Sequence, residues 1–229
     1  MIADLNEIKG VDVRLEAEDI LCDFIRLLRQ SSRYGATALT VDEFYDSVFY
    51  PRYEFRLKLG ILGYDADGQP ILGKTVFEKK EIVIDHSLVS GPRQEKYAET
   101  VAHEMAHVIL HAACFAEPDV QLAPGGQDEQ VLEDQADLFA ENFLMMPDLV
   151  RVRFDRHYGK GVKLEYAGSG YYDIDTATGR KSFCARSLTE YLDRVSEDLV
   201  ESCFGVARRD MGAKLLELAL VADCSSEAV

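Results

Sequence analysis

Hydrophobic residues recur with a helical period over much of this chain. The pattern is strongest in two segments, 92–113 (PRQEKYAETVAHEMAHVILHAA) and 128–146 (DEQVLEDQADLFAENFLMM), and Pro147 follows directly after the second. Both segments are predicted to be long helices. Shorter segments with the same spacing predict four further helices, at 15–30, 40–50, 187–204 and 204–221.

Two of the shorter helices also carry start signals. Thr40 is followed three residues later by Glu43, and Ser187 is followed in the same way by Glu190. A hydroxyl residue and a carboxylate at this spacing form a capping box, in which each side chain bonds to the backbone N–H of the other residue. Pro51 is predicted to end the first of these helices, because proline disrupts a helix interior.

The period changes to that of strands between residues 52 and 88. The segments 52–64 (RYEFRLKLGILGY) and 70–77 (PILGKTVF) flank the sequence DADGQ, whose Asp-Gly pair is a turn signal. The segment 79–88 (KKEIVIDHSL) is rich in β-branched residues and is a third strand candidate. Together these segments predict a small antiparallel sheet of about three strands.

Residues 148–187 give a weaker signal. Glycine and turn-forming residues are frequent there, which predicts loops with a hairpin at 171–183 (YYDIDTATGRKSF). The whole pattern is that of an α+β protein, mainly helical, with a small antiparallel β-sheet and a helical module at the C-terminal end.

Composition narrows the possible functions. The 229 residues carry a formal net charge of -16, so no direct nucleic-acid binding is expected. The five cysteines are scattered and include no C-x-x-C pair, which favours a reducing compartment over a disulfide scaffold. The first residues show no secretion signal, and no stretch reaches the ~18 apolar residues of a membrane span. We therefore expect a cytoplasmic protein without a membrane partner.

The strongest chemical signal is the order H-E-x-x-H in the first long helix, formed by His103, Glu104 and His107. Residues four apart lie on one helix face, so both imidazoles can bind one Zn²⁺ ion at the ~2.0–2.1 Å distance that zinc prefers. Glu104 projects about 100° round the helix from His103 and can reach a water molecule at the metal. The alternative is an amphipathic helix that contains two core histidines by chance.

A third ligand would favour the metal site, because a catalytic zinc takes three protein ligands and keeps one position open. The second long helix offers Glu133 and Asp137, again four apart and on one face. Taken alone, these two residues favour a solvated acidic helix face. Combined with the histidine pair, they favour a metal site. The order resembles the gluzincin type, which implies Glu133 as a zinc ligand and Asp137 as the acceptor of a hydrogen bond from a ligand histidine.

Other polar residues are weaker candidates. His111 is eight residues from His103, about 12 Å along the helix axis, so one ion cannot comfortably bind both; we interpret His111 as structural or substrate-facing. Asp134 is only the second choice as a ligand, and a lone strand histidine such as His86 is typically structural. The residue that would stabilise an oxyanion stays open among five candidates, His157, Tyr158, Tyr166, Tyr171 and Tyr172.

These motifs resemble those of the ImmA/IrrE family of bacterial and phage metallopeptidase-like proteins. The family shows H-E-x-x-H-x-x-x-H in one helix, as in HEMAHVILH here, followed by E-x-x-A-[N/D]-x-F-A-x-x-L-L-M-P, as in EDQADLFAENFLMMP. The similarity covers roughly residues 79–147 and 195–221, and Phe143–Leu144–Met145 replaces the usual Leu-Leu-Met. The second pattern is filled by Glu133, Ala136, Asp137, Phe139, Ala140, Leu144, Met146 and Pro147.

The resemblance implies a zinc-dependent endopeptidase in which His103, His107 and Glu133 bind Zn²⁺ and Glu104 is the general base. The implied substrate is a partner protein, typically a helix-turn-helix repressor of a mobile element or stress regulon. Two alternatives stay open. One is a metal-binding regulatory protein that acts by docking without proteolysis, and the other is the partner half of a toxin module.

The resemblance also implies a domain organisation. It places a zincin-like metallopeptidase domain over residues 1–150 and a helix-turn-helix-like helical module over residues 188–229. The loop-rich segment 151–187 between them is longer than the family pattern requires and is interpreted as an insertion.

Overall fold

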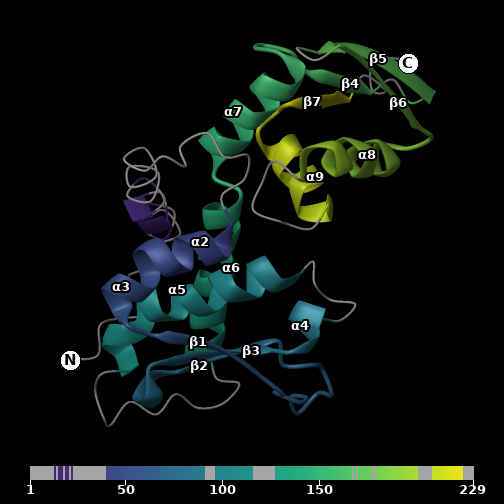
Figure 1. Cartoon of the computed structure of the whole chain (residues 1–229). Coiled ribbons are helices and arrows are strands. Elements are labelled where there is room, and N and C mark those ends of the chain that lie inside the picture. Colours follow the sequence, from purple (N-terminus) through teal and green to yellow (C-terminus); the bar gives the residue numbers. More distant parts are fainter. Residues whose placement is uncertain are drawn as a thin grey trace. The chain divides into compact units, whose positions relative to one another are not determined.

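The computed structural model of the chain divides into two compact units, Met1–Leu144 and Met145–Val229 (Figure 1). The mainly helical α+β fold expected from the sequence is confirmed. The helix predicted at 15–30 lies mostly outside the residues that the structure describes. Those residues are 13, 15–17, 19–20, 22, 40–90, 96–115, 127–166, 168, 170–176, 179–200 and 208–223.

Three consecutive helical elements open the first long described stretch: α2 (Val41–Phe44), the π-helix η2 (Tyr45–Phe49) and α3 (Tyr50–Tyr53). The predicted capping box is present, because Glu43 N–H donates to Thr40 Oγ1 and Thr40 N–H donates to Glu43 Oε2, both at 3.2 Å. The prediction that Pro51 ends the helix is wrong. Pro51 lies in the first turn of α3, where proline is tolerated, and the helix ends at Glu54 in a left-handed conformation (φ 61°).

The sheet of the first unit is mixed. It consists of β1 (Arg56–Gly60), β2 (Gly73–Val76) and β3 (Glu81–Asp85), in the order β1-β3-β2. β3 runs parallel to β1 and antiparallel to β2, so the prediction of an antiparallel sheet is wrong for one of the two pairings. β3 takes the central place because Ile82 and Ile84 are fully buried, whereas β1 and β2 contain no buried residue.

The Asp-Gly turn between β1 and β2 forms without joining two neighbouring strands. Asp65 N–H donates to the Gln69 carbonyl at 2.8 Å, and Tyr64 and Pro70 form an isolated bridge beside it. The Asp-Gly pair therefore predicts the turn itself but not which strands pair with each other. The place of β3 between β1 and β2 depends on burial, which the turn does not determine.

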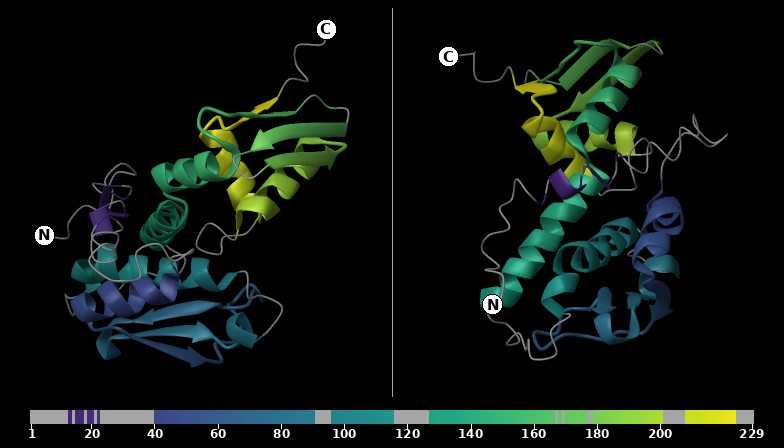
Figure 2. Two further views of the ribbon diagram at one scale, coloured as in Figure 1. Left: turned by 45° about the horizontal axis from the view of Figure 1, so that its top comes forward. Right: turned by 90° about the vertical axis from the view of Figure 1, so that its left-hand side faces the viewer.

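Helix α5 (Tyr97–Phe115) is the centre of the first unit. It packs against α6 (Gln127–Leu144) and also against β2 and β3 of the sheet (Figures 1 and 2). The two helices confirm those predicted at 92–113 and 128–146, except that residues 92–95 of the first lie outside the described residues. The buried side chains of the two helices include Val101, Ala102, Met105, Ala106, Leu132, Ala136, Phe139 and Phe143. Burial of one large apolar side chain stabilises the fold by about 1.5–3 kcal/mol, so this core holds the two helices in a fixed register.

The second unit combines helices with two short strand pairs. The elements of this unit are α7 (Pro147–Tyr158), β4 (Leu164–Tyr166), β5 (Gly170–Thr176), β6 (Gly179–Ala185), α8 (Leu188–Val200), α9 (Arg208–Glu217) and β7 (Val221–Asp223). The antiparallel pairing of β5 with β6 confirms the hairpin predicted at 171–183, and β4 pairs in parallel with β7.

The expectation of loops over 148–187 is wrong for α7. Val150, Phe154 and Tyr158 follow one another at four-residue spacing and are 1%, 0% and 0% exposed, so they form one buried helix face. Pro147, predicted to end the preceding helix, is also the first residue of α7, a position that suits proline.

The ends of the last helices refine the prediction. Glu190 N–H donates to Ser187 Oγ at 3.1 Å, as predicted, but the Glu190 carboxylate accepts from Arg186 N–H instead of Ser187 N–H. The helix predicted at 204–221 ends earlier, at Glu217, and Ala219 turns the chain (φ 52°) into β7. None of the described helices is long and apolar enough to cross a membrane.

Candidate metal centre

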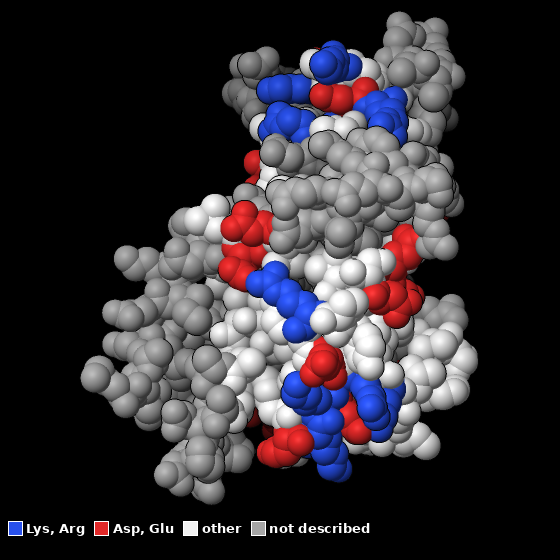
Figure 3. Space-filling view, turned by 60° about the vertical axis from the view of Figure 1, so that its left-hand side comes forward, with Lys and Arg blue, Asp and Glu red and all other residues white. Residues whose placement is uncertain are grey.

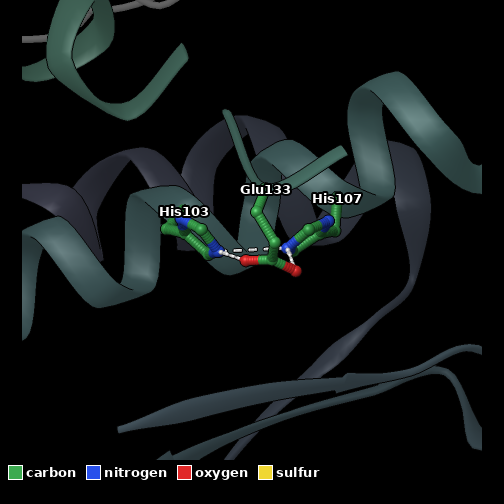
Figure 4. A group of neighbouring side chains, drawn as sticks. All are labelled: His103, His107 and Glu133. Atoms are coloured by element: carbon green, nitrogen blue, oxygen red, sulfur yellow. Dashed lines mark hydrogen bonds and ion pairs between the residues drawn. The ribbon is translucent and has the colours of Figure 1, made fainter. Parts of the chain in front are cut away.

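Three metal-binding side chains from α5 and α6 converge on one point (Figure 4). His103 Nε2 and His107 Nε2, from consecutive turns of α5, are 3.0 Å apart. Glu133 reaches them from α6, with Oε2 at 3.1 Å from His103 Nε2 and Oε1 at 3.5 Å from His107 Nε2. One ligand atom from each residue lies within 4.8 Å of the others. The convergence depends on the register of the two helices, which their buried core fixes.

These distances fit a metal ion. Ligand atoms at ~2.0–2.1 Å from a tetrahedral centre lie about 3.3–3.4 Å from one another. Here the two imidazole nitrogens are 3.0 Å apart, and each has a different Glu133 oxygen near it, at 3.1 and 3.5 Å. Two imidazoles and one carboxylate are also a donor set that metal ions accept in proteins. The group formed by His103, His107 and Glu133 could therefore hold a metal ion.

Asp137 fixes the orientation of the first histidine. It lies one turn after Glu133 on α6, and its Oδ1 is 2.8 Å from His103 Nδ1. A carboxylate in that position accepts the Nδ1–H proton, so the lone pair of Nε2 is free to face the metal position. The Asp137 side chain is 74% exposed, so this support comes from the surface of the protein.

The charges of the group are strongly coupled in the absence of a metal. Burial disfavours the charged form of His103, but hydrogen bonds to Asp137 and Glu133 outweigh burial and raise the pKa of the imidazole to about 10. Interactions with His103 and then with His107 hold the pKa of Glu133 well below its ordinary value. Both shifts favour a protonated His103 beside an ionised Glu133, so a metal that binds these atoms would compete with a proton.

Glu104 is held beside the histidines by β2. Its side chain is nearly buried, with 6% of the residue exposed, and its Oε2 accepts a hydrogen bond from Thr75 Oγ1 at 2.7 Å. Burial raises the pKa of this carboxyl, which the bond from Thr75 partly opposes. Gly73 leaves room for the carboxylate, because a Cβ there would lie 2.5 Å from Glu104 Oε1.

A cavity of about 540 Å³ opens over this group. Its lining includes His103, Glu104, His107 and Glu133, together with Gly73 and Thr75 of β2. Because β2 pairs only with β3 in the described sheet, it is an edge strand. The cavity thus combines a possible metal position, a carboxylate and an edge strand.

The weaker sequence candidates lie elsewhere. Asp134 is exposed and accepts a hydrogen bond from Gln130 Nε2 at 2.7 Å. His86 is exposed in the turn after β3, where its Nδ1 is 3.0 Å from Ser90 Oγ. Neither residue lines the cavity.

His111 is fully buried, so it is structural in position and does not face a substrate. Burial, and then the neighbouring His107, lower the pKa of its imidazole to about 4. It is not part of the metal-binding group, as expected from its distance along the helix.

The candidates for an oxyanion-stabilising residue all belong to the second unit, and the side chains of Tyr171 and Tyr172 lie outside those that the structure describes. Two of them are used in the core of that unit: the ring of Tyr158 packs at 4.9 Å from Phe154, and that of Tyr166 stacks at 5.6 Å on Tyr191. Which residue would stabilise an oxyanion stays open among His157, Tyr158, Tyr166, Tyr171 and Tyr172.

Three residues of the site lack a direct motif signal in the sequence: Gly73, Thr75 and Gln135, which bonds to His111. A glycine inside a predicted strand is the one available hint, because it often marks a close approach of another group. Thr75 lies 29 residues before Glu104, and no sequence spacing connects the two.

Comparison with known proteins adds no relatives. No protein-family model matches the chain, and no curated protein matches it significantly. The resemblance to the ImmA/IrrE family therefore stays a prediction carried by two motifs, and the interpretation of the site depends on its geometry.

Proposed function

We propose that this protein is a zinc-dependent endopeptidase of the ImmA/IrrE type that hydrolyses a peptide bond in a partner protein. One observation carries the proposal: two imidazoles and the Glu133 carboxylate converge at metal-ligand spacing, with Glu104 beside them on the same cavity. A site built only for structural zinc needs four protein ligands and no adjacent carboxylate. Three ligands with a fourth position open toward a cavity are typical of catalytic zinc.

Zinc suits this donor set and supplies a Lewis acid. His103, His107 and Glu133 would hold it, as His₂Glu sites do in known zinc peptidases. When bound, zinc polarises a substrate carbonyl and lowers the pKa of water toward ~7. Asp137 keeps the Nε2 lone pair of His103 directed at the ion by accepting the Nδ1–H proton.

Glu104 is the general base of the proposed reaction. Its carboxylate takes a proton from the attacking water and then delivers it to the amine of the leaving peptide. Burial, which raises its pKa, makes the carboxylate a stronger base than an exposed glutamate. Thr75 holds Oε2 in place, and the absence of a side chain at Gly73 leaves Oε1 at the cavity.

The neighbouring strand supports a peptide substrate. Gly73 and Thr75 line the cavity, and β2 is an edge strand of the described sheet. An edge strand has backbone N–H and C=O groups that an extended peptide can pair with. Only a segment that can adopt an extended conformation outside the fold of its own protein can pair in this way. This requirement favours cleavage of a few partner proteins over unselective proteolysis.

The charge distribution favours a protein partner over nucleic acid. The chain carries a net charge of -16. On the face drawn in Figure 3, Lys and Arg side chains lie among Asp and Glu side chains. Among the described residues, Lys58 is paired with Glu81 and Lys80 with Glu54. By the motif resemblance, the proposed partner is a helix-turn-helix repressor, and the proposed compartment is the cytoplasm.

The proposal is tested by Glu104→Gln, which removes the base while keeping the shape of the side chain. Zinc-loaded wild-type protein, incubated with a native bacterial lysate, should create new protein N-termini that mass spectrometry identifies. Glu104→Gln should lower cleavage of the identified protein by about 10²–10⁴-fold with zinc content unchanged. Glu141→Gln, an exposed change on α6 outside the cavity, is the matched control.

Two outcomes contradict the peptidase. One is cleavage by Glu104→Gln at the wild-type rate, and the other is no new N-terminus with the zinc-loaded wild type. The alternative function, a metal-binding regulator that acts by docking, predicts that Glu104→Gln keeps the full biological effect.

A further inference from the structure

His107 has a partner on the side away from the metal position. His111, one turn later on α5, places its Nδ1 at 3.1 Å from His107 Nδ1. The other ring nitrogen of His111, Nε2, is 3.0 Å from the side-chain oxygen Oε1 of Gln135 on α6. His111 is 0% exposed and Gln135 is 7% exposed, so the contact between them is buried, whereas the contact of His111 with His107 is partly buried.

The protons of these contacts are linked. A neutral imidazole has one N–H donor and one acceptor nitrogen. Because Gln135 Oε1 can only accept, His111 Nε2 must carry the proton, and His111 Nδ1 is then an acceptor. It follows that His107 Nδ1 donates to His111 Nδ1, which leaves His107 Nε2 without a proton.

The opposite arrangement would prevent metal binding. If the Gln135 amide were turned so that its nitrogen donated to His111 Nε2, His111 Nδ1 would carry the proton. His107 Nδ1 would then have to accept, and its own proton would move to Nε2, the atom that faces His103 and Glu133. A protonated Nε2 has no lone pair for a metal, so only the first arrangement is compatible with the site.

We propose that Gln135 and His111 are positioning residues that fix the proton of His107 on Nδ1 and so direct its Nε2 lone pair at the metal. They act on His107 as Asp137 acts on His103, but from the buried side of α5. The inference depends on metal binding at the site and is independent of peptidase activity, because its readout is the affinity for the ion alone.

The test is a matched pair of substitutions at one position. His111→Met and His111→Gln have flexible side chains of similar size, but the glutamine oxygen is a strong acceptor for a hydrogen bond from His107 Nδ1–H, whereas the thioether sulfur is only a weak one. Zinc affinity, measured by competition with a chromophoric chelator, should fall about 10–100-fold in His111→Met and recover most of this loss in His111→Gln. Gln135→Met should also weaken binding. Asn142→Leu, which removes another buried amide of α6, should leave affinity unchanged.

A second measurement needs no substitution. In the zinc-loaded wild type, long-range ¹⁵N–¹H NMR correlations should show His107 protonated at Nδ1 and His111 protonated at Nε2. A proton on His111 Nδ1 would overturn the proposal, as would an equal loss of zinc affinity in folded His111→Met and His111→Gln. If zinc does not bind the wild type at all, the inference fails together with the metal site; if zinc binds and no peptide is cut, only the peptidase fails.

Discussion

The two histidines of the candidate metal centre lie one turn apart on the same helix, yet partners of opposite character hold them. His103 bonds to Asp137, a charged residue whose side chain is 74% exposed. His107 bonds to His111, which is fully buried and stays uncharged when it accepts a hydrogen bond from His107. The difference teaches that a ligand can be oriented either by a carboxylate in water or by a neutral group in the core. Only the first support also stabilises a positive charge on its histidine.

The largest expected difference between the two supports concerns salt. Asp137→Ala should weaken zinc binding about 10–100-fold, because the partner of His103 Nδ1–H is lost. Because Asp137 is exposed, part of this effect is electrostatic and should shrink between low salt and 1 M salt, where the screening length falls to about 3 Å. Chelator competition at both salt concentrations measures it.

Asp134→Ala is the matched control, since Asp134 is exposed on the same helix and bonds only to Gln130 among the contacts described. The loss in His111→Met should be the same at both salt concentrations. Equal salt dependence of Asp137→Ala and His111→Met would remove the contrast between the two supports.

A smaller effect is the pH dependence of zinc binding, because the partners of His103 and His107 differ in how many protons are released when zinc binds. Because the pKa of His103 is raised to about 10, the histidine is protonated at pH 8 in the metal-free protein and must release that proton to bind zinc. Affinity should therefore rise about tenfold per pH unit up to about pH 10 from this group alone. Calorimetry at pH 8, in buffers of different ionisation enthalpy, counts the protons released.

Asp137→Ala should release fewer protons than wild type, and His111→Met the same number. The stability of the metal-free protein depends on pH in the opposite direction from its zinc affinity. The raised pKa of His103 stabilises the metal-free fold fully below pH 6.5, the ordinary pKa of histidine, and this contribution is lost as the pH rises through about 10. Zinc binding at pH 8 without proton release would contradict the prediction that Asp137 keeps His103 protonated in the metal-free protein.

The smallest effect comes from a change that touches neither support. Gly73→Ala would place a Cβ at 2.5 Å from Glu104 Oε1, which should cost about 1–3 kcal/mol of unfolding free energy and displace the carboxylate. Denaturant unfolding measures the stability, and the cleavage assay measures the activity. Zinc affinity should stay at the wild-type value, because the ligands are not moved.

Gly60→Ala is the control for overpacking alone. A Cβ at Gly60 would lie 2.7 Å from Val83 Cγ1, away from the cavity. It should lose stability and keep its activity. Equal loss of activity in both variants would show that Gly73 matters only for folding.

The helical half of the site is predictable from the sequence, and the strand half is not. Four-residue spacing places His103 with His107, and Glu133 with Asp137, whatever else the chain does. The contact of Thr75 with Glu104 requires β2 to lie next to α5, which follows from the order β1-β3-β2. The sequence predicts the strands but not that order, because the order depends on which strand is most buried in the folded unit.

The support of His107 could not be predicted for a related reason. The distance of His111 from His103 along the helix argues against it as a ligand, but spacing does not show which α6 residue faces it. Gln135 and His111 are 24 residues apart and meet only because the α5–α6 register is set by their buried core. In the second unit, α7 was missed because turn residues nearby outweighed three well-spaced apolar positions.

Every described residue that lines the cavity belongs to Met1–Leu144. Ion capture and bond cleavage, as proposed, would then draw on side chains of that unit, so the chemistry can be probed by substitutions confined to it.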